Sequence, residues 1–233
     1  LFITGALLVF YRGRVVNPLI QINGALRSML AGADAKVEYQ DDPSEVGELA
    51  RSLESYRIVV KQAEKDRWVK DNVASIASVL QTCETRPALA TGLLSEIVPM
   101  LGGGSGAVFL LGPKSGRFDF AAGYGFQPES GKAPSFAAGD GVIGQCALER
   151  KPIVLDGLPE GHLRVVSGMG QSPPRVSVAY PILSQDRVVG ALEIAMFAPP
   201  TPTQLNLLKE ATALAALNLE ILDRNIRTRE LLE

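Results

Sequence analysis

The sequence is poor in the side chains that most catalytic and metal sites use. Its 233 residues include one histidine, two cysteines and one tryptophan. The two cysteines, Cys83 and Cys146, cannot form a disulfide framework, and together with His162 they match no zinc-binding pattern. No G-x-S-x-G nucleophile motif is present. We therefore expect no catalytic residues and no metal site in this stretch of chain, and no cofactor is evident from the residues.

The chain also lacks an excess of either charge. It has 23 lysines and arginines against 25 acidic residues, a net charge of -2. Nucleic-acid binding requires a basic surface, so we expect no nucleic-acid partner. Apolar residues, at 46%, suffice for a folded core and argue against disorder. The length is typical of one or two domains.

No apolar run reaches the length of about 20 residues that a membrane-spanning helix needs. Residues 1–10 are largely apolar, and Tyr11, Arg12 and Arg14 follow them. An aromatic residue followed by arginines is typical of the cytoplasmic end of a transmembrane helix, whereas a signal peptide carries its charges before the run. We interpret residues 1–10 as the end of a transmembrane helix; a buried core helix is the alternative. The chain ends inside a helical pattern without a stop signal, so we expect further sequence beyond both termini.

Residues 11–66 contain two amphipathic helical patterns, joined by a polar connector at 33–43. Pro18 can open the first helix and Gly32 can end it, and Ser44 can open the second. Narrow apolar stripes of this kind are typical of coiled-coil seams. The stripe positions are Leu19, Ile22, Ala25 or Leu26 and Met29 in the first helix, and Val46, Leu49, Leu53, Tyr56 and Val60 in the second.

This pattern resembles a HAMP domain. Its signature residues here are Pro18, Gly32, Glu45, Gly47 and Leu49. Ser44 stands where the family usually has an aspartate, and serine also caps helices. The resemblance implies a parallel, dimeric four-helix bundle that relays a membrane signal; an ordinary helical hairpin is the alternative. The apolar seam continues beyond residue 60 but slips by one residue between 63 and 69, which indicates either altered winding or a domain boundary.

Residues 67–222 predict an α+β fold, an antiparallel sheet with helices on one side. We expect helices near 69–83, 88–101 and 142–150 and a long helix from about 203, with a glycine-rich loop at 102–106. The expected strands are 107–111, 117–121, 152–155, 176–182 and 188–194.

The order of these elements is similar to that of a GAF domain. The residues that carry the resemblance are the Gly-Asp-Gly-Val-Ile-Gly-Gln segment at 139–145, Asp156, the Tyr-Pro-Ile at 180–182 and the Val-Gly-Ala-Leu-Glu at 189–193. The resemblance implies a GAF-type antiparallel sheet with flanking helices and a pocket for a small ligand. We expect the pocket walls among Phe120, Tyr124, Phe126, Phe136, Ile143, Arg164, Tyr180 and Glu193.

Three other interpretations compete in this region. Gly139-x-Gly141-x-x-Gly144 matches a dinucleotide fingerprint, but no convincing strand precedes it, so only a weaker anion site at the start of the following helix remains. His162 could be a haem or metal ligand, although an exposed loop histidine is commoner. Cys146 could be a thiol sensor or a bilin anchor, but we expect a buried, inert thiol.

The C-terminal helix has two apolar stripes, and two stripes imply two partners. We expect one stripe to pack on the domain core and the other on the same helix of a second subunit. The first stripe comprises Leu205, Leu208, Thr212, Ala215, Leu219, Leu222 and Ile226, and the second comprises Leu207, Leu214, Leu217 and Ile221.

The predicted organisation is therefore a transmembrane end at 1–10, a HAMP domain with a signalling helix at 11–66, a GAF domain at 67–222 and the start of a coiled-coil linker at 223–233. The two resemblances imply the sensory and relay portion of a membrane-bound two-component histidine kinase whose kinase core lies elsewhere. HAMP and GAF would face the cytoplasm at the inner membrane, in a homodimer joined through HAMP and the C-terminal helices. A GAF domain that serves as a ligand-free dimerisation spacer, or the same modules from a chemoreceptor or diguanylate cyclase, are the alternatives.

Overall fold

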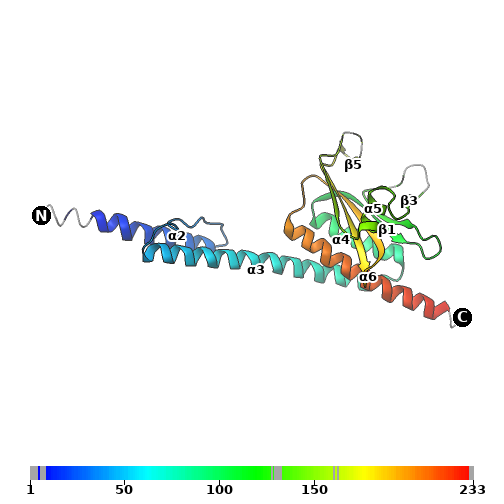
Figure 1. Ribbon diagram of the computed structural model, residues 1–233, viewed down its shortest axis with the longest axis horizontal. Coiled ribbons are helices and arrows are strands. Elements are labelled where there is room, and N and C mark those ends of the chain that lie inside the picture. The colour runs from blue at the N-terminus through cyan, green and yellow to red at the C-terminus, as the bar shows by residue number, and fades with distance from the viewer. Residues whose placement is uncertain are drawn as a thin grey trace. The chain divides into compact units, whose positions relative to one another are not determined.

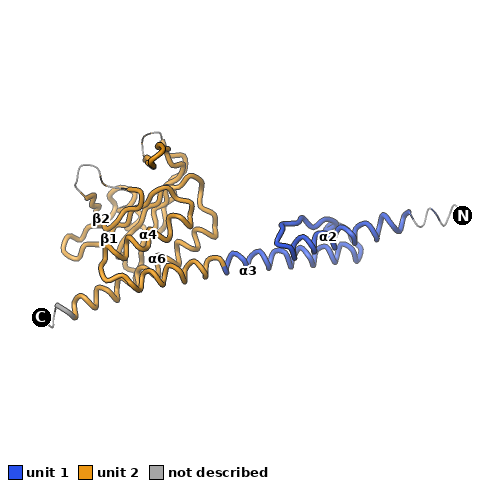
Figure 2. The backbone as a smooth tube through the Cα atoms, turned by 180° about the vertical axis from the view of Figure 1, so that it is seen from behind, with its two compact units in different colours: residues 1–67 blue, residues 68–233 orange. Residues whose placement is uncertain are grey.

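The computed structural model describes residues 5, 9–126, 128, 133–159, 161 and 163–230. The chain divides into two compact units, residues 1–67 (unit 1) and 68–233 (unit 2), which Figure 2 colours separately. One helix, α3 (Glu45–Gln81), contributes residues to both units. Most of the expected transmembrane segment lies outside the described residues. Among the described residues, no helix combines the length and apolar character that crossing a bilayer requires.

Unit 1 consists of a short π-helix, η1 (Arg12–Val16), then α2 (Asn17–Leu30), a connector and the first part of α3. Pro18 does not open the helix as expected, because η1 continues into α2 without a break and Val16 and Asn17 both have helical backbone angles. The connector contributes Val37, which is 2% exposed, to the small core of this unit. The other buried core residues are Ile22, Ala25, Val46, Ala50 and Leu53.

Basic side chains of α3 hold the connector at both ends. Asp34 pairs with Arg57 at 3.0 Å and with Lys61 at 2.6 Å. The hydrogen bond from Lys61, reinforced by Arg57, holds the pKa of Asp34 below its usual value. At the other end, Arg51 Nη1 donates hydrogen bonds to the carbonyl oxygens of Gln40 (2.8 Å) and Asp42 (3.1 Å). These contacts keep the connector against the helix that it precedes.

Unit 2 contains a six-stranded sheet in the order β3-β2-β1-β8-β7-β4, with antiparallel neighbours throughout. Figure 1 shows this unit, with β1 and β3 labelled. A separate ribbon pairs β5 with β6. The strands are β1 (Gly103–Leu111), β2 (Phe118–Tyr124), β3 (Ser135–Phe136), β4 (Ile153–Asp156), β5 (Val165–Ser167), β6 (Gly170–Ser172), β7 (Val176–Ser184) and β8 (Arg187–Met196).

Helices cover both faces of this sheet, which corrects the expectation of helices on one side. The main core lies between the sheet, α4 (Arg86–Met100), α6 (Pro202–Glu230) and the end of α3. A second apolar cluster lies on the opposite face, beneath α5 (Gly141–Glu149). Alternation along β1 separates the two, because Val108 belongs to the main core and Ala107 to the cluster beneath α5. We call these the α4–α6 face and the α5 face.

The glycine-rich segment expected as a loop is the start of β1. A Cβ atom at Gly106 would lie 3.1 Å from a Val98 methyl group and 3.2 Å from a Leu94 methyl group of α4. At Gly103, a Cβ atom would lie 2.9 Å from a methyl group of Ile194. Glycine therefore lets α4 and the neighbouring strand lie close to the start of β1.

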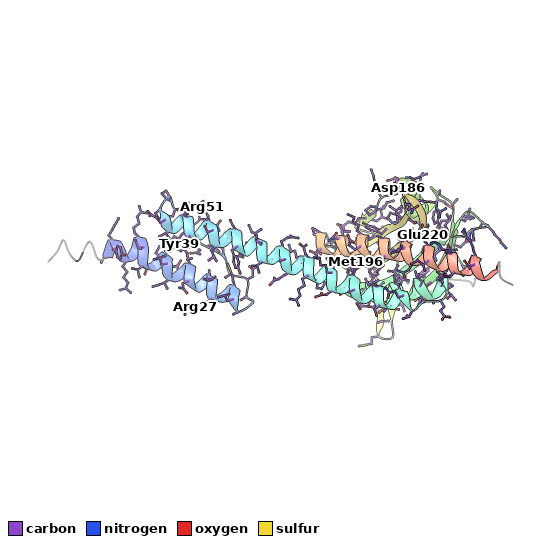
Figure 3. All side chains as sticks on the ribbon, turned by 90° about the horizontal axis from the view of Figure 1, so that it is seen from below. Arg27, Tyr39, Arg51, Asp186, Met196 and Glu220 are labelled. Atoms are coloured by element: carbon purple, nitrogen blue, oxygen red, sulfur yellow. The ribbon has the colours of Figure 1, made fainter. Side chains whose placement is uncertain are left out.

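The C-terminal helix α6 is held on unit 2 along most of its length. Arg86 of α4 pairs with Asp223 at 3.2 Å. The hydroxyl of Ser184 donates a hydrogen bond to Glu220, beside the β7–β8 turn that contains Asp186 (Figure 3 labels Glu220 and Asp186). Gln185 and Asp186 both have positive φ angles, 44° and 62°, which suits a two-residue hairpin turn.

The two predicted stripes of α6 have different surroundings. The first is largely buried in the main core: Leu219 is 1% exposed and Leu222 is 8% exposed. The second stripe is buried only in part: Leu207 is fully buried, whereas Leu217 and Ile221 are 54% and 50% exposed. Among the described residues of α6, Leu217 and Ile221 leave the largest apolar surface, and Ile226 of the first stripe is also exposed, at 37%.

Candidate functional site

The α5 face of the sheet has a floor of small residues at its centre. Ala107 of β1 lies opposite Gly123 of β2 on one side and Glu193 of β8 on the other, and Glu193 lies opposite Ala179 of β7. Residues directly opposite one another share a face of the sheet. Between β2 and β7, Glu193 is therefore the one long side chain in this row, which ends at Ile153 of β4.

The next row also carries small residues on β1, β8 and β7, two of them with hydroxyl groups, and it ends at Leu155 of β4. Ser105 and Ser177 lie on either side of Ala195. The Ser177 hydroxyl, on a residue with no exposed surface, donates a hydrogen bond of 2.5 Å to Glu193 Oε1. Among the described residues, no lysine or arginine forms an ion pair with Glu193. We call these two rows, with Glu193, the small-residue floor.

Phenylalanine side chains border the floor at the β2 end. The Phe109 ring lies 5.9 Å from that of Phe120 and 5.3 Å from that of Phe136, in edge-to-face arrangements, and Phe120 lies 6.0 Å from Phe126. A Cβ atom at Gly123 would lie 3.3 Å from Phe120 Cζ and 2.3 Å from the carbonyl oxygen of Phe126. The glycine is needed because the aromatic segment lies directly against this end of the floor.

Helix α5 borders the site over β7 and β8, and its cysteine is buried, as expected. Cys146 has no exposed surface, and its thiol donates a hydrogen bond to the Lys151 carbonyl oxygen at 3.3 Å. Burial, with the negative charges of Glu149 and Glu193, raises the pKa of Cys146 to about 12. The thiol is therefore protonated at neutral pH, which does not suit a nucleophile.

The structure brings together most, but not all, of the predicted pocket residues. Phe120, Phe126, Phe136 and Ile143 share the apolar cluster of the α5 face, where Glu193 also stands. The two tyrosines, Tyr124 and Tyr180, pack against the opposite α4–α6 core. Arg164 is exposed, immediately before β5. His162 lies outside the described residues.

The start of α5 provides no favourable environment for an anion. The N-cap residue is Asp140, whose carboxylate lies 3.8 Å from the Arg117 guanidinium. A negative charge at this position opposes a second one. The strand before the glycines, β3, has two residues in an antiparallel sheet, so the βαβ unit of a dinucleotide-binding fold is not present here.

The five residues on which the predicted resemblance to HAMP rests occupy distinct structural positions in unit 1. Gly32 follows α2 with a φ of 79°, and Glu45 is the first residue of α3. A Cβ atom at Gly47 would lie 1.8 Å from the Asp42 carbonyl oxygen, so the connector requires glycine there. The Ser44 hydroxyl donates to the Asp42 carboxylate at 2.5 Å, and the Ser44 carbonyl oxygen accepts from the Glu48 N–H of the helix. Pro18 is buried.

Two grooves in unit 1 expose the predicted seam. Leu49, which is 46% exposed, lines the first groove together with Leu19. The second groove has a volume of about 390 Å³, and Tyr56, at 54% exposure, lies along it. Its other apolar lining residues are Leu26, Met29, Leu30 and Val60.

Comparisons with known proteins identify the fold of unit 2. The family model of the GAF domain matches residues 83–220, more than half of the chain. No curated protein matches the sequence. Similar solved structures include the GAF domain of a phosphoenolpyruvate-protein phosphotransferase from Coxiella burnetii, with 15% identity, a TM-score of 0.56 and coverage of 67% of this chain and 95% of that one.

Two further structures have the same fold. The GAF domain of Nlh2 from A. aeolicus, in an inactive state, has 16% identity and a TM-score of 0.53 over 67% of this chain and 98% of that one. Free methionine-R-sulfoxide reductase from Neisseria meningitidis, in complex with its substrate, has 17% identity and a TM-score of 0.53 over 67% and 91%. At these identities the likeness concerns the fold alone. On the family match, the chain belongs to the GAF domain family, which comprises sensory and signalling modules.

Proposed function

We propose that this chain is the sensory and signal-relay portion of a dimeric, membrane-bound sensor protein. In this proposal unit 1 is a HAMP-type relay, and unit 2 is the GAF module that receives or modifies its signal. Helix α6 then carries the change to an output domain, for which a histidine kinase core is our first choice. The observation that carries the proposal is the exposed apolar seam of unit 1.

The seam is only half covered within one chain. Ile22 and Val46 are 6% and 7% exposed, whereas Leu49 and Tyr56, on the same helix as Val46, are about half exposed. Apolar side chains exposed along two grooves of one small unit are typical of an interaction site. A second copy in parallel would bring the two seams together and cover both grooves, as in a coiled coil.

The continuity of α3 supports relay from unit 1 to unit 2. Val46 and Leu53 belong to the core of unit 1, and Ile76 and Leu80 belong to the main core of unit 2. All four lie on one helix. A rotation or shift of α3 that repacks the first pair would also change the packing of the second. Such a helix can couple two sites, provided that each site favours one of two arrangements.

The exposed part of α6 supports a second contact between subunits. Leu217 and Ile221 lie one turn apart and are exposed, and the helix extends to Glu230, while residues 223–228 after the buried Leu222 are partly or fully exposed. Leu219, by contrast, is a core residue of unit 2 and would not face a partner.

The membrane and kinase parts of the proposal depend on the sequence. The apolar start followed by Arg12 and Arg14 favours a location at the inner membrane with both units in the cytoplasm. GAF domains also occur in chemoreceptors and other signalling proteins, so a kinase core is one of several outputs that the same relay could serve.

Disulfide cross-linking tests the dimeric seam. In a Cys83→Ser, Cys146→Ala background, we expect Leu49→Cys and Tyr56→Cys each to form a covalent dimer under mild oxidation. Cross-linking requires that the paired Cα atoms approach within about 7 Å. Ser55→Cys is the matched control. Ser55 is exposed and lies on a different side of α3 from Tyr56, because successive residues of a helix are about 100° apart. Equal cross-linking at all three positions, or none at the seam, would contradict the proposal.

A further inference from the structure

The C-terminal part of α6 is held on unit 2 by the start of α4. Arg86 is the first residue of α4, and the Thr85 hydroxyl caps this helix by accepting from the Ala88 N–H. Arg86 Nε lies 3.2 Å from Asp223 Oδ1, and Arg86 Nη2 donates to Asp223 Oδ2 at 3.5 Å. Residues 224–228, which follow on α6, are exposed. The position at which α6 leaves the domain is therefore fixed at Asp223.

Arg86 also contacts the sheet. Its Nη2 donates to the carbonyl oxygen of Leu111, the last residue of β1, at 3.3 Å. Strand β1 contributes to both apolar clusters, because Leu110 belongs to the main core and Phe109 to the cluster beneath α5. A change of packing on either face of the sheet that moves the end of β1 therefore also moves a hydrogen-bond acceptor of Arg86.

The ion pair between Arg86 and Asp223 is incompletely formed. Arg86 Nε is buried and makes no hydrogen bond, although the carboxylate is close by. Hydrogen bonds between a guanidinium and a carboxylate are commonly bidentate and about 2.7–2.9 Å long, shorter than both contacts here. A buried donor without an acceptor is unfavourable. A second arrangement, in which Nε and Nη2 both donate to Asp223, therefore requires only a small displacement.

A second contact holds the same turn of α6. Ser184, the last residue of β7, donates a hydrogen bond to Glu220. Glu220 and Asp223 are three residues apart, which places them on one side of the helix. Strands β1 and β7 run in the same direction, because each is antiparallel to β8. Their last residues therefore lie at the same end of the sheet, and both are tied to one turn of α6.

We infer that the contacts of Glu220 and Asp223 couple the sheet of unit 2 to the end of α6, with Arg86 as the positioning residue. In one arrangement Arg86 is shared between Leu111 and Asp223. In the other it pairs fully with Asp223 and draws α6 towards the start of α4. A change that moves the end of β1 shifts the balance between the two arrangements. The inference rests on the proposed relay through α6 and names the contacts that regulate it.

Distances between two spin labels in one chain test this coupling. In a Cys83→Ser, Cys146→Ala background, one label is placed on α4 at Thr91→Cys and the other beyond the ion pair at Thr228→Cys, with unlabelled chain in excess. Both labelled positions are exposed. We expect Asp223→Asn to broaden the distribution of this distance by about twofold, because the last turns of a helix open readily once a contact is lost.

A label before the ion pair distinguishes positioning from general loosening. The distance between Thr91→Cys and Ala213→Cys, both exposed, should keep its distribution in Asp223→Asn. An unchanged Thr91–Thr228 distribution would overturn the inference. Equal broadening for both pairs of labels would also overturn it, since the ion pair would then be an ordinary structural contact.

Two further variants identify the ion pair as the cause. Arg86→Gln should broaden the Thr91–Thr228 distribution as Asp223→Asn does, and the double variant should broaden it no further, since substitutions that remove one shared contact are not additive. Additive effects would contradict the inference. Glu210→Gln removes an exposed carboxylate from the same helix and is the matched control, which should leave the distribution unchanged.

The measurement does not depend on the dimer, because both labels lie in one chain. Unchanged distances together with covalent dimers at Leu49→Cys would contradict the coupling alone. The expected broadening without cross-linking at Leu49→Cys would contradict the dimeric seam and leave the coupling supported.

Discussion

The two units of this chain differ in how completely each buries its own apolar residues. In unit 2, both layers of the main core contain side chains with no exposed surface, such as Leu93 of α4 and Leu192 of β8. In unit 1, the buried cluster is small, and Leu49 and Tyr56 beside it are about half exposed. A complete core can stabilise a domain in isolation, whereas an incomplete one depends on a partner. The difference indicates that the stability of unit 1, more than that of unit 2, depends on association with a partner.

The same substitution in each core gives the largest expected contrast. We expect Leu192→Ala to lower the free energy of unfolding of unit 2 by about 2–5 kcal/mol, because it leaves a cavity in a fully packed core. Leu53 lies at the edge of the unit 1 cluster, with 9% exposure. We therefore expect Leu53→Ala to lower the free energy of unfolding of unit 1 by an amount at or below the lower end of that range.

Denaturant unfolding can follow the two units separately. The single tryptophan, Trp68, packs against the main core of unit 2, so its fluorescence reports on that unit, while circular dichroism reports on both. Equal losses in the two variants would show that the two cores are equally complete and would contradict the difference between the units.

Two glycines of unit 1 provide a smaller contrast within one unit. Gly47→Ala places a Cβ atom 1.8 Å from the Asp42 carbonyl oxygen, so the connector must move. We expect a loss of about 1–3 kcal/mol in the stability of unit 1. Gly24→Ala, in the middle of α2 with no atom within 4 Å of the new Cβ, should instead stabilise the helix by up to about 1 kcal/mol. Thermal melting by circular dichroism measures both; a neutral Gly47→Ala would mean that the connector is loosely held.

The stability of unit 2 should decline at alkaline pH and that of unit 1 at acid pH, and these are the smallest of the expected effects. Cys146 has a folded pKa of about 12, above its usual value near 9, so unit 2 keeps this contribution below pH 9 and loses it as the pH rises from 9 towards 12. Asp34 has a lowered pKa, so unit 1 keeps the contribution of its ion pairs at neutral pH and loses it below about pH 4.

Two variants isolate these groups. Cys146→Ala should flatten the alkaline decline of the Trp68 transition, and Asp34→Asn should flatten the acid decline of unit 1. Because Asp34 is a surface residue, added salt should reduce its effect. Pairs of melting curves across pH measure both, and an acid decline that Asp34→Asn leaves unchanged would assign it to other carboxylates.

The longer elements of unit 2 could be predicted from sequence because their patterns are strong. The segments 176–182 and 188–194, which are rich in apolar residues, are predicted as strands, and the structure extends them by a few residues to β7 and β8. The short ribbon of β5 and β6 was not predicted, since three-residue strands carry too little periodicity. In the sequence, the glycines of β1 suggest a loop. Their role is to allow close packing against α4, and this tertiary contact is not visible in the sequence.

The candidate site shows where sequence reasoning ends. Glu193 and the phenylalanines could be proposed from their residue types, but Tyr124 and Tyr180 lie on the other face of the sheet. Assignment to a face depends on bulges and register, which single residues do not reveal. The small residues of the floor were missed for the same reason. The place of Ala107 and Gly123 in the floor becomes apparent only from the strand pairing, which puts them in the same row as Glu193.

The most direct test of the account is the dependence of unfolding on protein concentration. Thermal melting of the full chain should be followed by circular dichroism and by Trp68 fluorescence over a wide range of concentration, with the mass checked by sedimentation equilibrium. If a second copy completes unit 1, its transition will move to higher temperature as the concentration rises, and the Trp68 transition will move less. A monomer in which neither transition depends on concentration would contradict the dimeric relay.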